Sequence, residues 1–397
     1  MNIRKLLLAA GAFLLVPSLS YAGDKDMNSV INEDITFATR QYSLMLDQVG
    51  RDGKIRIPKT IDELGRMVYI PTDDWCSGFF AGSLFYLYQL TNDKSWLKQS
   101  KRFTEALDSI QYLKWHHDVG FMIGSSYLNN YRLNPTKAYK KVIIQTAKSL
   151  CTRFRKKAGV IQSWNVDRGW QSKRGWSCPV IIDNMMNLEL LFEATRLSGD
   201  STYWKIAVSH ADKTMENQYR PDGSCFHVVD YDPTTGAVLH RQTAQGYADN
   251  SAWARGQAWS VYGYTTCYRY THDRKYLDRA VKSLNFMMQN PNLPDDLVPY
   301  WDFDAPNIPN EPRDASTAAC VASALYEMDT YLPDNGYAAL ADRIIRSLST
   351  PAYRPALGKN GCFLLMHSVG SIPHNNEIDV PLNYADYYFL EALTRRK

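Results

Sequence analysis

The chain has 397 residues with a formal net charge of +4, and no Lys/Arg block resembles the basic tracts that bind nucleic acid, so we expect no nucleic-acid partner. This length could hold two domains, but a single closed ring of helices is equally large. The seven Cys are scattered without CxxC spacing, which favours buried free thiols over a disulfide framework or a zinc site.

The first 22 residues have the pattern of a secretory signal peptide. Arg4 and Lys5 form its basic start, residues 6–17 are almost wholly apolar, and Ser20 and Ala22 supply a small-x-small cleavage site. We expect cleavage after Ala22 and an exported protein, periplasmic or secreted, in which residues 23–397 form a single domain. No later apolar run reaches the roughly 20 residues that span a bilayer, so we expect no membrane association.

A helical hairpin is repeated along the rest of the chain. In each copy a helix rich in Leu and aromatic residues ends in a short polar turn, and Tyr or Trp opens a second, amphipathic helix. The Asp or Asn in each turn is expected to cap the second helix. Further helices are expected at about 28–49 and 384–395. The copies lie at residues 84–97, 127–139, 191–204 and 264–277, with a looser one at 322–337.

This repetition predicts an all-α (α/α)6 barrel, a ring of about twelve helices whose inner members converge on a central cavity. The alternative is an open solenoid, such as a TPR array, that binds partners along a concave face. The distance between turns varies over roughly 40 to 75 residues, which argues against a solenoid of uniform repeats. In a barrel, the long inserts at residues 163–178 and 224–251 would carry the functional site.

Trp and Tyr side chains gather in the segments that precede the inner helices. Trp75, Trp164, Trp253 and Trp259 all lie in such segments, each with polar residues nearby. Aromatic faces stack on the C–H surfaces of pyranose rings and polar groups fix the hydroxyls, so this pattern is typical of a sugar site. The alternative is that these rings are ordinary core residues.

Asp118 and Asp183 are the candidates for acid/base chemistry. Each lies at the start of an inner helix, where burial would raise the pKa of the carboxyl and leave it protonated near neutral pH. Either residue could instead be an N-cap. Asp183 follows Ile181 and Ile182, an apolar setting that a solvent-facing cap does not need. Asp314 is expected to be a cap or an ion-pair partner rather than a catalytic group.

Arg255 and three histidines complete the set of polar candidates. Arg255 stands between two tryptophans, where it could bind a carboxylate with two hydrogen bonds or stack on the rings. His116, His117 and His227 could donate to a substrate or position an Asp. No HxH or HExxH spacing points to a metal, and GxSxG, Walker and GxGxxG motifs do not occur. We therefore expect neither a metal nor a cofactor.

Five segments together resemble the unsaturated glucuronyl hydrolases of glycoside hydrolase family 88. They occur in the family's order over nearly the whole mature chain, and the combination of Ser-x-Trp-Ala-Arg-Gly-Gln-Ala-Trp with Asp-Asn-x-Met-Asn is the most specific part. The resemblance implies an (α/α)6 barrel, which agrees with the hairpin repeat. The segments are residues 117–122, 182–187, 251–259, 299–303 and 384–393.

The resemblance also implies an activity. A member of this family is an exported glycosidase that takes the 4,5-unsaturated uronic acid from the non-reducing end of glycosaminoglycan oligosaccharides made by polysaccharide lyases. Its reaction is hydration of the C4=C5 vinyl ether, so the carboxylate-separation rule for retaining and inverting enzymes does not apply to Asp118 and Asp183. By this resemblance Asp183 would protonate C4 and then activate the water that adds at C5, and the hemiketal would open and release the remaining sugar.

Two alternatives to this activity stay open. One is the sister family of unsaturated rhamnogalacturonyl hydrolases, with the same chemistry on pectin fragments. The other is a non-catalytic, glycan-binding helical protein.

Family positions assign roles to further residues. Asp118 matches the second carboxylate, which would help to hold the proton of Asp183. Because a cation close to Asp183 would lower the pKa of that carboxyl, we expect Arg255 to face the substrate instead. The residues expected to bind substrate are Trp75, His117, Trp164, His227, Gln245, Trp253, Arg255 and Trp259.

Overall fold

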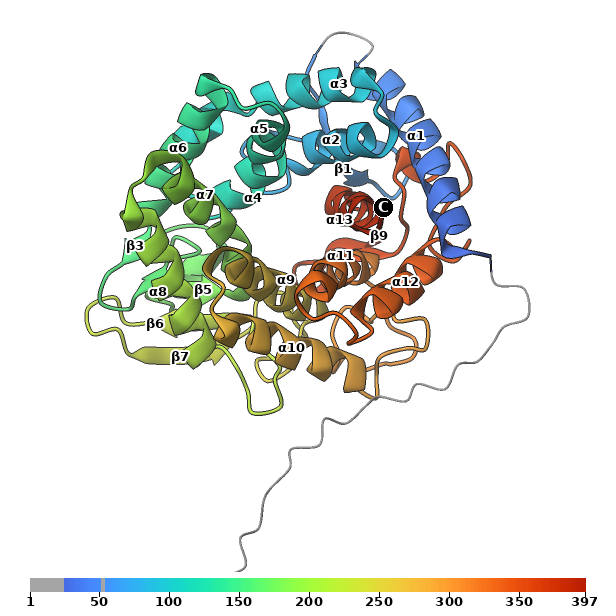
Figure 1. Ribbon diagram of the computed structural model, residues 1–397. Coiled ribbons are helices and arrows are strands. Elements are labelled where there is room, and N and C mark those ends of the chain that lie inside the picture. Colours follow the sequence, from blue (N-terminus) through green and yellow to red (C-terminus); the bar gives the residue numbers. More distant parts are fainter. Residues whose placement is uncertain (1–24, 51–53) are drawn as a thin grey trace, which may run out of the picture.

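The helices form two concentric rings (Figure 1). The computed structural model describes residues 25–50 and 54–397, so the expected signal peptide lies outside the described residues. The outer ring contains α1 (Met27–Gly50), α3 (Lys94–Glu105), α6 (Lys137–Cys151), α8 (Ser201–Asn217), α10 (Arg274–Gln289) and α12 (Tyr337–Leu348). The inner ring contains α2 (Phe79–Thr91), α4 (Val119–Ile123), the π-helical turn η2 (Gly124–Leu128), α5 (Asn129–Leu133), α7 (Leu188–Ser198), α9 (Ala254–Thr271), α11 (Ala315–Tyr331) and α13 (Asn383–Arg396).

The sequence of each helix decides which ring it joins. An outer helix such as α12 buries a single stripe, formed by Ala341, Ile344, Ile345 and Leu348, and exposes the opposite face. An inner helix such as α11 is buried at every position from 315 to 328, and its run of Ala, Ser and Cys lets neighbouring helices approach closely. Polar residues inside such a helix are removed from water and must therefore find hydrogen-bond partners within the protein.

The polar turns cap the outer helices largely as the sequence indicates. The side chains of Asp93, Asp200 and Asp273 each accept a hydrogen bond from the backbone N–H two residues later and so begin α3, α8 and α10. The turn before α6 differs, because Thr136 rather than Asn134 takes the extended N-cap geometry and accepts from the Tyr139 N–H. The N-cap of α12 is a left-handed glycine, Gly336, and the Ala338 N–H of its first turn donates to the Asp329 side chain of α11 at 3.0 Å.

The ring closes where the last inner helix meets the first. Helix α13 packs against both α2 and α11, and α1 packs against α2 and α12. The (α/α)6 barrel is therefore confirmed, and the open solenoid is wrong. All seven cysteines are free, and six of them are buried, as expected. Among the helices of residues 25–50 and 54–397, none combines the length and apolar character needed to cross a membrane.

Short strands, which the helical pattern did not predict, connect the helices. The inserts at 163–178 and 224–251 contribute to a three-stranded antiparallel sheet in the order β5-β6-β7 and to the loops around it. The 3-10 helix η4 (Ile182–Asn187) leads from this sheet into α7. The strands are β1 (Ile57–Ile61), β2 (Met67–Ile70), β3 (Phe154–Arg155), β4 (Val160–Ile161), β5 (Pro179–Ile181), β6 (Val228–Tyr231), β7 (Val238–Gln242), β8 (Ser368–Ser371) and β9 (Asn376–Val380).

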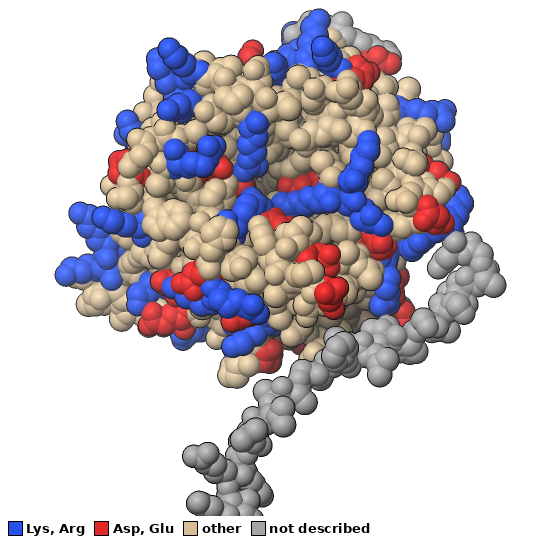
Figure 2. Space-filling model, viewed as in Figure 1, with Lys and Arg blue, Asp and Glu red and all other residues tan. Residues whose placement is uncertain are grey.

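A network of ion pairs joins five of the inner helices. Glu189 pairs with Arg132 and Arg269, and Glu327 pairs with Arg269 and Arg395. Figure 2 views the end of the ring at which α13 finishes, and blue and red side chains meet there in a central hollow. The candidate site residues lie at the other end, where the inner helices begin.

Candidate active site

Asp183 reaches the centre of the ring because a sheet precedes it. Strands β5 and β6 pair with Ile181 opposite Val228, and the Ile182 N–H donates to the His227 carbonyl at 3.0 Å. This register brings the two side chains together, so that His227 Nε2 lies 3.7 Å from Asp183 Oδ2. Asp183 stands on the 3-10 helix η4 rather than at the mouth of the α-helix itself.

The Asp183 carboxyl is buried and does not cap a helix. Its residue is 9% exposed, and Oδ2 has no hydrogen-bond partner among the described residues. Burial raises the pKa of Asp183 to about 7, although the positive charge of Arg255 and hydrogen bonding, including a contribution from Trp259, oppose the rise. The protonated acid is therefore well populated near neutral pH, as acid catalysis requires.

Asp118 meets this site from a second inner helix. It stands at the amino end of α4 without a capping hydrogen bond, and its Oδ2 lies 3.2 Å from His117 Nε2. Burial raises the pKa of Asp118 well above its usual range, and the nearby charge of Asp183 acts in the same direction. Gly120 permits the approach of α4 to η4, because a Cβ there would lie 2.5 Å from the Cα of Asn187.

An aromatic pocket of about 330 Å³ opens above Asp118. Trp75 and Trp164 stand in its wall, as expected for residues that stack on a sugar ring. Trp164 also stacks on Trp176, with ring centroids 5.6 Å apart, and meets Trp170 edge-on. The full lining is Trp75, Trp115, His116, His117, Asp118, Ser163, Trp164, Asn165, Arg168 and Gln171.

Arg255 is held in place by protein groups. Its guanidinium is buried, forms an ion pair with Asp314 at 3.1 Å, and donates to the carbonyls of Val369 and Gly370 in β8. Its charge lowers the pKa of Asp183, while its guanidinium is bonded to Asp314 and β8 rather than to Asp183. Its role as a substrate ligand stays a prediction.

Asp314 fulfils both of the roles expected for it. Its carboxylate accepts from the Ser316 N–H at the start of α11, and it pairs with Arg255. It is thus a cap and an ion-pair partner.

The remaining predicted ligands surround His227. The Trp253 ring lies 4.5 Å from the imidazole, between centroids, and Gln245 donates its backbone N–H to His227 Nδ1 at 3.2 Å. The Gln245 amide also donates to the Gly370 carbonyl at 3.2 Å. Trp259 is buried beneath the site against Phe121, so its contact with a sugar stays a prediction.

Two buried amides in the site were not assigned a role from the sequence. Asn184 and Asn187 are both inaccessible, and they connect His117 and α4 to the segment that bears Asp183. The available signal was the placement of two amides one and four residues after Asp183 in an otherwise apolar run. No group of three or more His, Cys, Asp or Glu in residues 25–50 and 54–397 is placed to hold a metal ion.

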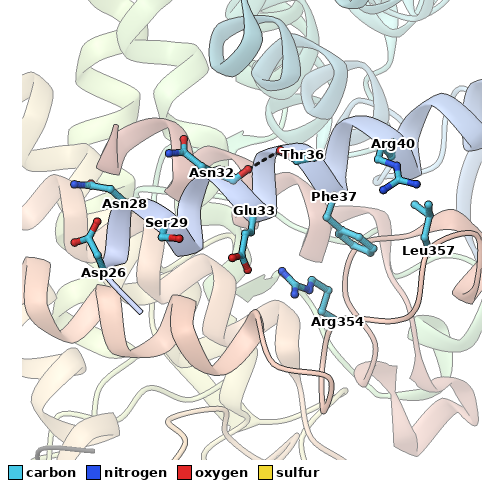
Figure 3. A pocket seen from close by; sticks show the side chains of 10 residues that line it. All are labelled: Asp26, Asn28, Ser29, Asn32, Glu33, Thr36, Phe37, Arg40, Arg354 and Leu357. Carbon is cyan, nitrogen blue, oxygen red and sulfur yellow. Dashed lines mark hydrogen bonds between the residues drawn. The ribbon is translucent and has the colours of Figure 1, made fainter. Parts of the chain in front are cut away.

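A larger hollow, of about 680 Å³, lies on the outside of the ring along α1. Figure 3 shows that polar side chains of α1 line it, with Glu33 and Arg354 facing each other across it. Aromatic walls and the buried Asp118 are features of the smaller pocket, and its Trp164 lies 5.9 Å, between ring centroids, from His227, the neighbour of Asp183, so the candidate site is placed there.

Two buried carboxyls close to a tryptophan-lined pocket, at one end of an (α/α)6 barrel, are typical of a glycoside hydrolase. Within that class the chain belongs to Glycosyl Hydrolase Family 88, whose model matches residues 56–388.

The chain is similar to individual members of this family over most of their length. The chain is 45% identical over 347 residues to an unsaturated glucuronyl hydrolase of Formosa agariphila, covering 87% of this chain and 86% of that protein. It is 32% identical over 374 residues to an unsaturated chondroitin disaccharide hydrolase of Streptococcus agalactiae, covering 92% and 91%. The crystal structure of an unsaturated glucuronyl hydrolase specific for heparin superimposes with a TM-score of 0.88 at 43% identity, covering 93% of this chain and 97% of that one.

Proposed function

We propose that this protein removes the 4,5-unsaturated uronic acid from the non-reducing end of glycosaminoglycan oligosaccharides produced by lyases. The observation that carries the proposal is Asp183, a buried, protonatable carboxyl beside His227, with one oxygen that has no hydrogen-bond partner in the part of the chain that the structure describes. The similarity to hydrolases named for unsaturated glucuronyl, chondroitin and heparin substrates supports this substrate class.

The reaction adds water across the C4=C5 double bond. Asp183 donates its proton to C4, which leaves positive charge shared between C5 and the ring oxygen. The Asp183 carboxylate then takes a proton from water as that water bonds to C5, which restores the acid. The resulting hemiketal opens, and the remaining sugar leaves with its hydroxyl. Trp75 and Trp164 would wall the sugar during these steps.

The test is loss of the ultraviolet absorbance of the conjugated double bond. We expect the wild-type protein to consume unsaturated chondroitin and heparin disaccharides, and Asp183→Asn to bind them without turnover, because an amide cannot supply the proton. Turnover of pectin-derived unsaturated disaccharides alone would favour the rhamnogalacturonyl activity. Binding without any turnover by the wild type would indicate a non-catalytic glycan-binding protein.

We also propose that the protein is exported and acts in polysaccharide degradation outside the cytoplasm. The support is the basic start, apolar stretch and Ser20-Tyr-Ala22 site of the first 22 residues. Determining the amino-terminal residue of the protein recovered from its native host tests this. A start at Gly23 is expected, and a chain that keeps Met1 would contradict export by this route.

A further inference from the structure

The hydrogen bonds around the two carboxyls place protons on specific atoms. We propose that Asn184 fixes His117 with an unprotonated Nε2 beside Asp118, which keeps Asp118 protonated and leaves Asp183 as the one carboxyl of this pair whose charge changes during the reaction. The catalytic role in this inference rests on the proposed function. The positions of the protons follow from the contacts alone. Asn184 and His117 are therefore positioning residues.

The orientation of each amide is fixed by a backbone group. Asn187 accepts the Phe121 N–H through Oδ1 at 3.0 Å, so its Nδ2 is the group that donates to Asn184 Oδ1 at 3.3 Å. Asn184 in turn donates from Nδ2 to the Ile161 carbonyl at 2.7 Å. Its Oδ1 is consequently an acceptor, and this oxygen faces His117 Nδ1 at 3.4 Å.

This orientation decides the tautomer of His117. Nδ1 must carry a hydrogen in order to donate to Asn184, and burial keeps the ring neutral because it lowers the imidazole pKa well below its ordinary value. A neutral ring with its hydrogen on Nδ1 presents a lone pair at Nε2. That lone pair lies 3.2 Å from Asp118 Oδ2.

The neighbouring histidine has no hydrogen to donate to the Asp118 carboxyl. His116 Nδ1 accepts the backbone N–H of Asp118 at 3.1 Å, so this nitrogen carries no hydrogen for Oδ2, 3.5 Å away. An ionised Oδ2 would thus meet the His117 lone pair and no ring N–H, whereas a protonated Oδ2 can turn its hydrogen toward His117 Nε2. The contacts favour the protonated acid.

Charged groups on the surrounding elements act in both directions. Asp183 on η4 and Asp74 before α2 disfavour a negative charge on Asp118, whereas hydrogen bonding from the Asn187 side chain and the charge of Arg153 after α6 favour one. Arg153 is already occupied, since its guanidinium donates to the carbonyls of Lys114, Gln162 and Ser163 and to the Asn165 side chain. Burial is the largest of these effects, so together with the lone pair of His117 Nε2 it favours the neutral form of Asp118.

Asp183 has the opposite kind of neighbour. His227 Nδ1 accepts the backbone N–H groups of Ala244 and Gln245, at 3.1 and 3.2 Å, so the ring hydrogen resides on Nε2. That N–H faces Asp183 Oδ2 at 3.7 Å. A donor stabilises the carboxylate that appears when Asp183 gives its proton to C4, while the neutral Asp118 adds no negative charge beside it or beside the uronate.

The tautomers can be observed directly. In protein labelled with ¹⁵N in histidine, we expect His117 to show a protonated Nδ1 and an unprotonated Nε2, His227 to show the reverse, and both patterns to persist from about pH 5 to about pH 9. His117→Gln and His227→Gln assign the signals. A hydrogen held on Nε2 with an unprotonated Nδ1 in His117 would overturn the proposal, as would titration of this ring in that range.

The proton on Asp118 has its own infrared signature. Near neutral pH the carboxylic-acid carbonyl absorption of the wild type should include a band from Asp118 that is lost in Asp118→Asn, while the band of the protonated Asp183 is present in both proteins. If the two proteins have the same carboxylic-acid absorption, Asp118 is ionised and the proposal is wrong. Neither measurement requires turnover, so both can fail or succeed independently of the proposed activity.

A kinetic test separates positioning from a merely structural role. Asn184→Asp places a carboxylate against His117 Nδ1, which favours the imidazolium and hence an ionised Asp118. The added negative charge beside Asp183 should move the basic limb of kcat/KM upward by about one pH unit. The matched control is Asn130→Ala, which removes a buried amide bonded to Ser100 and Thr104.

Asn130→Ala should lower the free energy of unfolding and leave the basic limb of kcat/KM at the same pH. Reduced activity of Asn184→Asp with an unmoved limb would overturn the proposal. If that variant does not fold, the two spectroscopic measurements on the wild type decide the question.

Discussion

At the scale of single residues, the site depends on the charge state of Asp183. Burial raises the pKa of this carboxyl to about 7, and the Arg255 guanidinium limits the rise. Arg255 is itself held by Asp314 and by two carbonyls of β8, so its charge stays in place whether or not substrate is bound. At this pKa a large fraction of Asp183 is protonated and can donate its proton. The carboxylate that remains is basic enough to take a proton from water.

The pH dependence of activity follows from this value. The protonated form of Asp183 is the active one, so kcat/KM should be level just below about pH 7 and should fall about tenfold for each pH unit well above it. Initial rates of double-bond loss at low substrate concentration measure this limb. A limb centred near the ordinary Asp value of about 4 would show that burial does not control the acid.

At the scale of elements, the approach of α4 to η4 brings the two carboxyls together. Gly120→Ala would place a Cβ 2.5 Å from the Asn187 backbone, so the two segments must separate. We expect a loss of about 1–3 kcal/mol in the free energy of unfolding, as for other overpacked sites, and a marked loss of kcat. Denaturant unfolding and initial rates measure the two effects.

A nearby glycine provides the control for that substitution. Gly124 begins η2, and a Cβ there would meet nothing within 4 Å. Gly124→Ala should therefore leave kcat unchanged and keep or slightly increase stability, because Ala is the better helix residue. Equal losses in the two variants would show that the tight Gly120 contact does not position the carboxyls.

The helices of this fold are more predictable than its site. Local signals such as Asp93, Asp200 and Asp273 in polar turns are read correctly, since a cap needs only residues that are close in sequence. The strands β5 to β7 were missed because each is short and is stabilised by pairing with a distant segment. The partners of Arg255 in β8 were missed for the same reason, as they lie over a hundred residues away.

At the scale of the whole molecule, ion pairs around the buried Glu327 and the partly buried Glu189 connect five inner helices. Glu327 on α11 is bonded by Arg269 of α9 and Arg395 of α13, and Arg269 continues through Glu189 of α7 to Arg132 of α5. The aromatic end of the ring must stay open to admit a sugar, so it cannot be closed by packing alone. The ion pairs stabilise the ring from the other end, and in doing so they hold the amino ends of the same helices around the site.

Removing one charge from this network should destabilise the whole ring. Glu327→Gln leaves Arg269 and Arg395 without a shared carboxylate, and we expect a loss of about 3–5 kcal/mol in the free energy of unfolding, as for other broken buried pairs. The control is Asp278→Asn, which breaks the exposed pair with Arg274 on the outer helix α10 and should cost less than about 1 kcal/mol. Similar losses in both variants would contradict a special role for the network.

The pH dependence of stability gives the network a signature of its own. Burial alone would raise the pKa of Glu327, but Arg269 and Arg395 reverse this and lower it to about 2. Because the pKa is lower in the folded than in the unfolded state, the stabilisation is complete above the unfolded value of about 4.3 and is lost as the pH falls through about 2. A gap of this size corresponds to about 3 kcal/mol. The unfolding free energy of the wild type should therefore fall more steeply than that of Glu327→Gln within this window, and parallel curves would show that Glu327 is not held ionised by its two arginines.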